Sequence, residues 1–139
     1  MNFLDLDLML GKKGTQKPKE LSPLTLAYVG DAVYELLVRT VVLSDGNAPV
    51  NRLHKKARNM VNAKAQAEFY HRIAEELTEE EAAVFRRGRN AKSYTMPKNA
   101  NMMDYRYATG VEAIFGYLYL AGQTERALAL FRKGMEQII

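Results

Sequence analysis

Residues 26–42 read LAYVGDAVYELLVRTVV, a mostly apolar stretch that carries a carboxylate, Asp31, near its middle. Apolar side chains recur every three to four residues, which is the spacing of an amphipathic α-helix. Ser22 and Pro23 precede the stretch and favour a helix start there, Ser22 as the cap and Pro23 in the first turn. We therefore predict one helix from this cap to the SDGN turn. Asp31 then needs a cation, hydrogen-bond donors or a metal, if it leaves water.

The rest of the chain also has a helical rhythm, and no useful run of β-type alternation is present. The stretch after the SDGN turn predicts two helical segments with a bend near Asn62. Thr78 and Glu81 have the spacing of a capping box, which predicts the start of the next helix. Gly88 and the polar residues after it predict the end of that helix, and Asn101 predicts the start of another. The predicted fold class is all-α, with about six or seven helices.

Length and composition suit one soluble domain, because 139 residues with 47% hydrophobic content can bury a core. We expect residues 1–20 to form a flexible leader and residues 21–139 to form the folded domain. The absence of cysteine excludes disulfides and, with only two histidines, zinc sites built on Cys and His. No charge-free apolar run approaches the roughly 18–20 residues that span a bilayer, and the N-terminus lacks a basic secretory signal. We expect a cytoplasmic protein.

Basic residues are segregated along the chain, although the formal net charge is only +4. Two windows contain no acidic residue, one between Asp45 and Glu68 and one between Glu81 and Asp104. Each window contains five Lys or Arg residues, so together they hold half of the 20 in the chain. This pattern indicates a polyanion such as a nucleic acid as partner. A solvated basic face without a ligand is the alternative.

A second isolated carboxylate, Glu112, lies in the stretch GVEAIFGYLYLAG, where it is the only charge between Arg106 and Glu125. If the fold brings Asp31 and Glu112 together, they can share Mg²⁺, which takes oxygen ligands and keeps several waters. Such a site beside a basic surface suits hydrolysis of a phosphodiester bond. Two ordinary exposed acids remain the alternative, because one sequence does not place the two side chains in space.

The stretch AYVGDAVYELLV, residues 27–38, resembles the signature helix of the ribonuclease III family. TGVEAIFGYLYL, residues 109–120, resembles the second acidic motif of the same family. The resemblance implies that Asp31 and Glu112 are the catalytic residues and the metal ligands of a Mg²⁺-dependent, double-strand-specific endoribonuclease. The sequence departs from the family pattern at Ala27 and Thr109, where the family carries two further acids.

The resemblance covers nearly all of residues 20–139 and is strongest to the short, stand-alone bacterial form of the family. It implies a catalytic domain without a separate double-stranded RNA-binding domain, acting as a homodimer. It also implies cleavage that leaves 5′-phosphate and 3′-hydroxyl ends, in the maturation of 23S ribosomal RNA precursors. A ribosomal protein on the precursor is a further candidate partner, and no membrane is involved.

A domain without an appended module must grip the RNA duplex by itself, through its phosphates and shape. The basic segment after Glu81 suits this role. We predict that its cations and amides bind RNA: Arg86, Arg87, Arg89, Asn90, Lys92 and Lys98. A non-catalytic helical RNA-binding or ribosome-assembly module is the alternative function, because two acids of the family pattern are missing.

Overall fold

Seven α-helices make up most of the residues that this computed structural model describes, which are 5–11, 17–92, 101–136 and 138. They are α1 (Leu6–Leu10), α2 (Pro23–Leu43), α3 (Val50–Val61), α4 (Ala63–Ile73), α5 (Glu79–Asn90), α6 (Met102–Leu120) and α7 (Thr124–Gly134). Two short 3₁₀ turns, η1 (Pro18–Glu20) and η2 (Ala74–Glu76), complete the order. No strand occurs within these ranges, so the prediction of an all-α fold is confirmed.

Local side-chain caps start the main helices where the sequence predicts. The Ser22 hydroxyl accepts a hydrogen bond from the backbone at the start of α2, and Asn62 does the same for α4 after the predicted bend. Both halves of the capping box between Thr78 and Glu81 are formed at the start of α5. Asn101 caps α6 through two backbone N–H groups. Each cap satisfies donors that the first helical turn leaves without a partner.

The predicted end of a helix at Gly88 is wrong, because α5 continues to Asn90. Gly88 is buried against α6, where an added Cβ would lie 3.0 Å from the Cα of Gly110. The glycine therefore allows two helix backbones to approach closely, and this packing role outweighs its tendency to end a helix.

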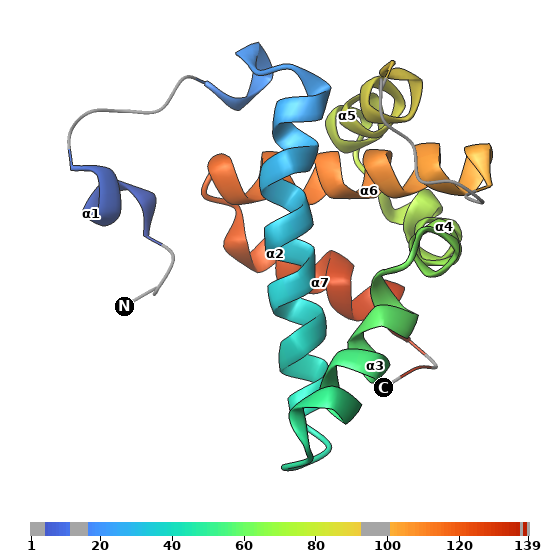
Figure 1. The fold of residues 1–139 in the computed structure, drawn as a ribbon. Coiled ribbons are helices and arrows are strands. Elements are labelled where there is room, and N and C mark those ends of the chain that lie inside the picture. The colour runs from blue at the N-terminus through green and yellow to red at the C-terminus, as the bar shows by residue number, and fades with distance from the viewer. Residues whose placement is uncertain (1–4, 12–16, 93–100, 137, 139) are drawn as a thin grey trace.

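Helix α6 is central to the fold and packs against α2, α4, α5 and α7 (Figure 1). Figure 1 shows α2 running steeply across α6, with α3 packed against the far end of α2. The two predicted motif helices, α2 and α6, are thus in direct contact. None of the helices in the described parts of the chain combines the length and hydropathy required for a bilayer crossing.

An aromatic cluster holds four helices together at the centre of the domain. The ring of Tyr34 on α2 makes edge-on contacts with Phe69 on α4, Phe115 on α6 and Phe131 on α7, with centroid distances of 5.3, 5.6 and 5.7 Å. Edge-to-face pairs of this kind add to the free energy gained by burying the rings. Tyr34 is therefore a core residue, 1% exposed, and is not available to stack on a nucleic-acid base.

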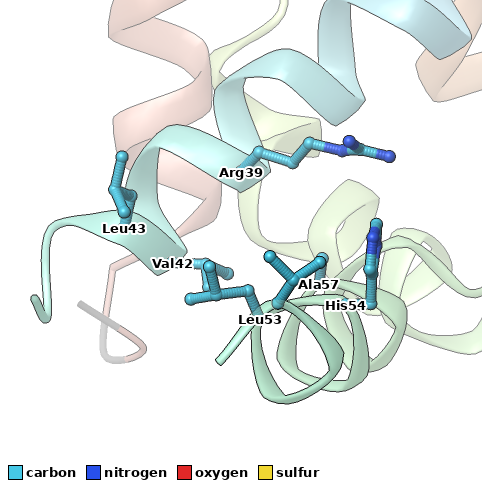
Figure 2. Close-up of a pocket in the computed structure, with 7 residues that line it drawn as sticks. Arg39, Val42, Leu43, Leu53, His54 and Ala57 are labelled. Carbon is cyan, nitrogen blue, oxygen red and sulfur yellow. The ribbon is translucent and has the colours of Figure 1, made fainter. Parts of the chain in front are cut away.

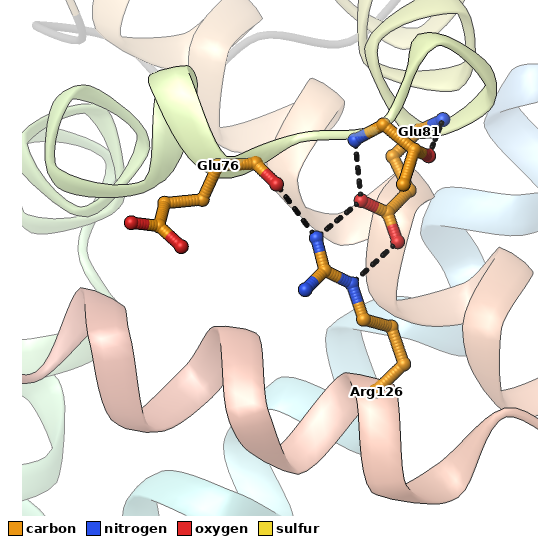
Figure 3. Close-up of polar contacts among 4 residues, drawn as sticks. Glu76, Glu81 and Arg126 are labelled. Carbon is orange, nitrogen blue, oxygen red and sulfur yellow. Dashed lines mark hydrogen bonds and ion pairs between the residues drawn. The ribbon is translucent and has the colours of Figure 1, made fainter.

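A buried ion pair joins the start of α5 to α7 (Figure 3). Glu81 is 3% exposed, and Arg126 donates to its two carboxylate oxygens from Nε at 2.9 Å and from Nη2 at 2.8 Å. Arg126 Nη2 also donates to the carbonyl oxygen of Glu76, while the Thr78 N–H donates to Glu81. Burial raises the pKa of Glu81, but the hydrogen bonds from Arg126 and Thr78 outweigh it and hold the pKa below its ordinary value.

Within the expected N-terminal leader, the structure contains the short helix α1. Its Leu8 and Met9 side chains are 67% and 66% exposed, so α1 buries little apolar surface. The flexibility of residues 1–20 and the boundary of the folded domain at residue 21 stay predictions.

Candidate active site

The backbones of α2 and α6 touch where the two conspicuous carboxylates lie. A Cβ at Gly30 on α2 would lie 1.6 Å from the carbonyl oxygen of Glu112, and a Cβ at Gly116 on α6 would lie 1.9 Å from that of Leu26. Only glycine permits such an approach of two helices. Asp31 directly follows Gly30, so the crossing brings the two carboxylates to the same place.

Asp31 lies next to the carboxyl group of Glu112. Its exposed side chain lies within hydrogen-bonding reach of the half-buried Glu112 carboxyl. Burial, the charge of Asp31 and a hydrogen bond to Asp31 together raise the pKa of Glu112 to about 8. Two carboxyl groups at this separation gain from a shared proton or a cation, because like charges in a partly desolvated site repel.

Gln66 on α4 is the third polar side chain at this place. Its Nε2 donates to the Val61 carbonyl oxygen at 2.9 Å and to Glu112 Oε2 at 3.4 Å. The hydrogen bond from Gln66 lowers the pKa of Glu112 and so opposes the other effects. Gln66 is not among the residues predicted from the sequence, although its spacing from Phe69 and Ile73 places a polar residue on the inner stripe of a helix.

The two departures from the family pattern leave the site with fewer oxygen ligands. Ala27 and Thr109 are 7% and 8% exposed, and the Thr109 hydroxyl donates to the Tyr105 carbonyl oxygen at 3.1 Å. Across the described ranges, no three His, Cys, Asp or Glu side chains gather as a metal-binding group.

The remaining donor set still fits a hard divalent cation. Mg²⁺ is commonly held by one or two carboxylates and keeps several waters, and Asp31 and Glu112 supply two. A cation bound between these two carboxylates would offset the repulsion between their negative charges.

The predicted RNA-binding residues lie at the end of α5 and beyond it. Arg86, Arg87, Asn90 and Lys92 are exposed and Arg89 is half-buried, whereas Lys98 lies outside the described residues. Helix α5 packs along α6, the helix that carries Glu112.

Two of these arginines also make contacts within the chain. Arg87 Nη2 donates to the Leu21 carbonyl oxygen at 3.3 Å. Arg89 donates to Asn90 and lies over the ring of Phe85, 5.9 Å from its centroid. The basic surface is therefore attached to the same helix pair as the carboxylates, through the packing of α5 on α6 and through Leu21, which precedes the Ser22 cap of α2.

The ribonuclease III domain family matches residues 24–123 of this chain. The chain is 53% identical over 126 residues to Mini-ribonuclease 3 of Thermoanaerobacter sp. (strain X514), which covers 91% of this chain and 87% of the relative. It is 50% identical over 119 residues to Mini-ribonuclease 3 of Clostridium tetani (strain Massachusetts / E88), covering 84% and 79%. The crystal structure of protein FN1578 from Fusobacterium nucleatum superposes with a TM-score of 0.78 at 31% identity, covering 90% of this chain and 100% of that one.

These matches span both motif helices and the carboxylate pair between them, and they confirm the resemblance to the short form of the family. The chain belongs to the ribonuclease III family of double-strand-specific endoribonucleases, among the Mini-ribonuclease 3 proteins.

Proposed function

We propose that this chain is a Mg²⁺-dependent endoribonuclease that cleaves double-stranded RNA by hydrolysis of phosphodiester bonds, in the maturation of 23S ribosomal RNA precursors. The observation that carries the proposal is the pairing of Asp31 and Glu112 at the crossing of α2 and α6. Family membership implies a divalent metal. The choice of Mg²⁺ rests on the all-oxygen donor set. The 23S precursor, and a ribosomal protein on it as a partner, rest on the resemblance alone.

Asp31 and Glu112 are the proposed catalytic residues and metal ligands. When bound, Mg²⁺ supplies an activated water and positive charge against the phosphate. In this proposal the exposed Asp31 carboxylate would orient that water, and the half-buried Glu112 carboxylate would be the second ligand. Their crowding favours the metal-bound form over two free carboxylates.

The end of α5 and the two residues after it form the proposed RNA-binding surface, with Arg86, Arg87, Arg89, Asn90 and Lys92. Lys98, the remaining residue predicted from the sequence, lies outside the described residues and stays part of the proposal. Acid-free basic surface of this kind binds phosphates without reading base sequence. The exposed basic side chains of α3 are proposed as further phosphate contacts: Arg52, Lys55, Lys56 and Arg58. Duplex RNA presents phosphates and 2′-hydroxyls on its accessible face, which fits such contacts.

A homodimer is part of the proposal, and an apolar stripe on the outer side of α2 supports it. Tyr28, Leu36 and Leu43 are 80%, 49% and 57% exposed, and their spacing places them on one side of the helix. At its end the stripe meets an apolar pocket of about 210 Å³ (Figure 2). The pocket is lined by Arg39, Val42, Leu43, Val50, Leu53, His54 and Ala57. Large exposed apolar side chains of this kind, here beside the Glu35–Arg39 ion pair, are common at an interface between protein chains.

Cleavage of labelled duplex RNA tests the proposal, with native protein and Asp31→Asn compared in Mg²⁺ and in EDTA. The amide keeps the shape of the side chain and removes its charge. We expect the native protein to cut only with Mg²⁺, and the variant to bind RNA without cutting it. A mobility shift without scission by the native protein would instead support the RNA-binding module, which the buried Ala27 and Thr109 at two acid positions favour.

Sedimentation of the native protein and of Tyr28→Asp tests the homodimer. We expect the native protein to sediment as a dimer and the variant as a monomer. A stable, active native monomer would count against the dimer.

A further inference from the structure

Gln66 is a polar side chain in an apolar setting. It is 3% exposed and lies on the face of α4 that carries Phe69 and Ile73, both fully buried against the core. A buried amide is costly unless its donors and acceptor find partners. A buried glutamine at this position is therefore expected to make specific hydrogen bonds.

One end of the amide is fixed by the break between α3 and α4. Val61 is the last residue of α3, so its carbonyl oxygen belongs to the terminal group that the helix leaves without an internal partner. Gln66 Nε2 donates to this oxygen at 2.9 Å and to Glu112 Oε2 at 3.4 Å. The reversed amide would turn its own carbonyl toward these two acceptors, so the observed orientation is the one that both favour.

The carbonyl oxygen at the other end of the amide lacks a partner in this arrangement, which is an energetic cost. Among the buried side-chain nitrogen and oxygen atoms of the described residues, Gln66 Oε1 is the one without a hydrogen-bond partner. A residue that served only to satisfy Val61 would not require a second donor aimed at Glu112. We infer that Gln66 is a positioning residue, whose side-chain N–H groups hold the Glu112 carboxylate ready to bind the divalent metal. The inference rests on the proposed function, since it takes Glu112 as a metal ligand.

Hydrogen bonds from neighbouring residues to metal ligands commonly contribute 10–100-fold to metal affinity, because they orient the ligand before the ion arrives. Gln66→Met keeps the length and burial of the side chain and removes its N–H groups. We expect this variant to bind Mn²⁺ at least about 10-fold more weakly, by electron paramagnetic resonance of the free ion, and to need correspondingly more Mg²⁺ for half-maximal cleavage. Gln123→Met is the matched control, because Gln123 is exposed and precedes α7 without a side-chain cap.

Three outcomes distinguish the positioning role of Gln66 from the proposed metal-dependent function. Weaker Mn²⁺ binding by folded Gln66→Met, with normal binding by Gln123→Met, supports the positioning role. Native affinity in Gln66→Met, together with lost affinity in Asp31→Asn, overturns the positioning role and leaves the proposed function standing. Native affinity in Asp31→Asn overturns the metal site itself.

A measurement on the native protein covers the case in which Gln66→Met does not fold. The side-chain amide signals of Gln66 in a ¹⁵N spectrum report on the charge of the carboxylate that accepts from them. We expect these signals to shift on addition of Mg²⁺, while those of Gln123 stay in place. Unchanged Gln66 signals at saturating Mg²⁺ would overturn the inference.

Discussion

Gly30 and Glu112 meet backbone to backbone, so closely that a Cβ at Gly30 would lie 1.6 Å from the carbonyl oxygen of Glu112. This contact does more than pack two helices. It fixes the distance between the residue after Gly30, which is Asp31, and the side chain of Glu112 itself. The geometry of the candidate active site thus depends on the absence of one methyl group.

Gly30→Ala is expected to separate α2 from α6 and to destabilise the fold. The alanine methyl group would meet rigid backbone, and overpacking of this kind typically costs about 1–3 kcal/mol. Urea unfolding followed by circular dichroism measures the loss. Gly88→Ala is the control, because its Cβ would lie 3.0 Å from its nearest neighbours and demands a smaller shift. Equal stability of Gly30→Ala and the native protein would contradict the close crossing.

Glu112→Gln is expected to stabilise the metal-free protein while abolishing cleavage. Near pH 7 the raised pKa of about 8 keeps the folded Glu112 mostly protonated, whereas the unfolded carboxyl is charged, and this difference destabilises the fold. The amide does not titrate, so we expect a gain of roughly 1–2 kcal/mol in EDTA. Mg²⁺ should then raise the melting temperature of the native protein but not that of the variant, since a ligand stabilises only the state that binds it.

The matched control for this change is Glu35→Gln, one turn beyond Asp31 on α2. Glu35 pairs with Arg39 at 3.1 Å on the exposed side of the helix, so its loss should leave both stability and the Mg²⁺ response nearly unchanged. A Glu112→Gln protein that melts below the native protein in EDTA would show that the carboxylates do not repel.

Arg126→Met is expected to destabilise the fold by about 3–5 kcal/mol, because it leaves the buried Glu81 carboxylate without its cation. The double variant Glu81→Met, Arg126→Met should recover most of the loss, since no buried charge then remains. Lys133→Met serves as the control, because its ion pairs with Glu76 and Glu136 are exposed. A double variant as unstable as Arg126→Met would contradict this account.

Acid should weaken the native protein through Glu81. The pKa of Glu81 in the folded protein lies below the ordinary value of 4.5. When the pH falls below 4.5, Glu81 therefore binds a proton in the unfolded chain before it does so in the folded protein. The stability that Glu81 contributes is therefore complete above about pH 4.5 and is lost as the pH falls through its folded pKa. The stability difference between the native protein and Arg126→Met should narrow as the pH falls below about 4.5, with other carboxyl groups cancelling in the comparison. A constant difference would exclude this linkage.

Replacement of two exposed cations, Arg86→Gln with Lys92→Gln, is expected to weaken duplex RNA binding and to flatten its salt dependence. Each phosphate contact removed should lower the slope of log affinity against log salt by about 1. Fluorescence anisotropy over a salt series measures the slope, and Lys133→Gln on α7 is the control. A native slope in the double variant would place the RNA elsewhere on the molecule.

Most of the fold was predictable, because its signals are local. Ser22, Asn62, Thr78 and Asn101 start helices through bonds to residues two or three positions on, and these bonds are readable from the sequence. The prediction at Gly88 fails because the deciding contact is not local. Its neighbour Gly110 lies on another helix, and nothing near Gly88 in the sequence announces that contact.

In the candidate site, too, local sequence predicts some features and the packing of helices decides the others. The sequence pattern marks Asp31 and Glu112 as acids within mostly apolar stretches, and the resemblance of these stretches to a family indicates a common role. Asp31 and Glu112 meet because of the glycine crossing. The amide of Gln66 lies beside the break between α3 and α4 and reaches Glu112, which is 46 residues further along the chain. Helix periodicity and caps act over one turn of chain, so residue order suffices for them. Contacts between helices depend on how whole faces pack, and only the folded core decides which side chains share a site.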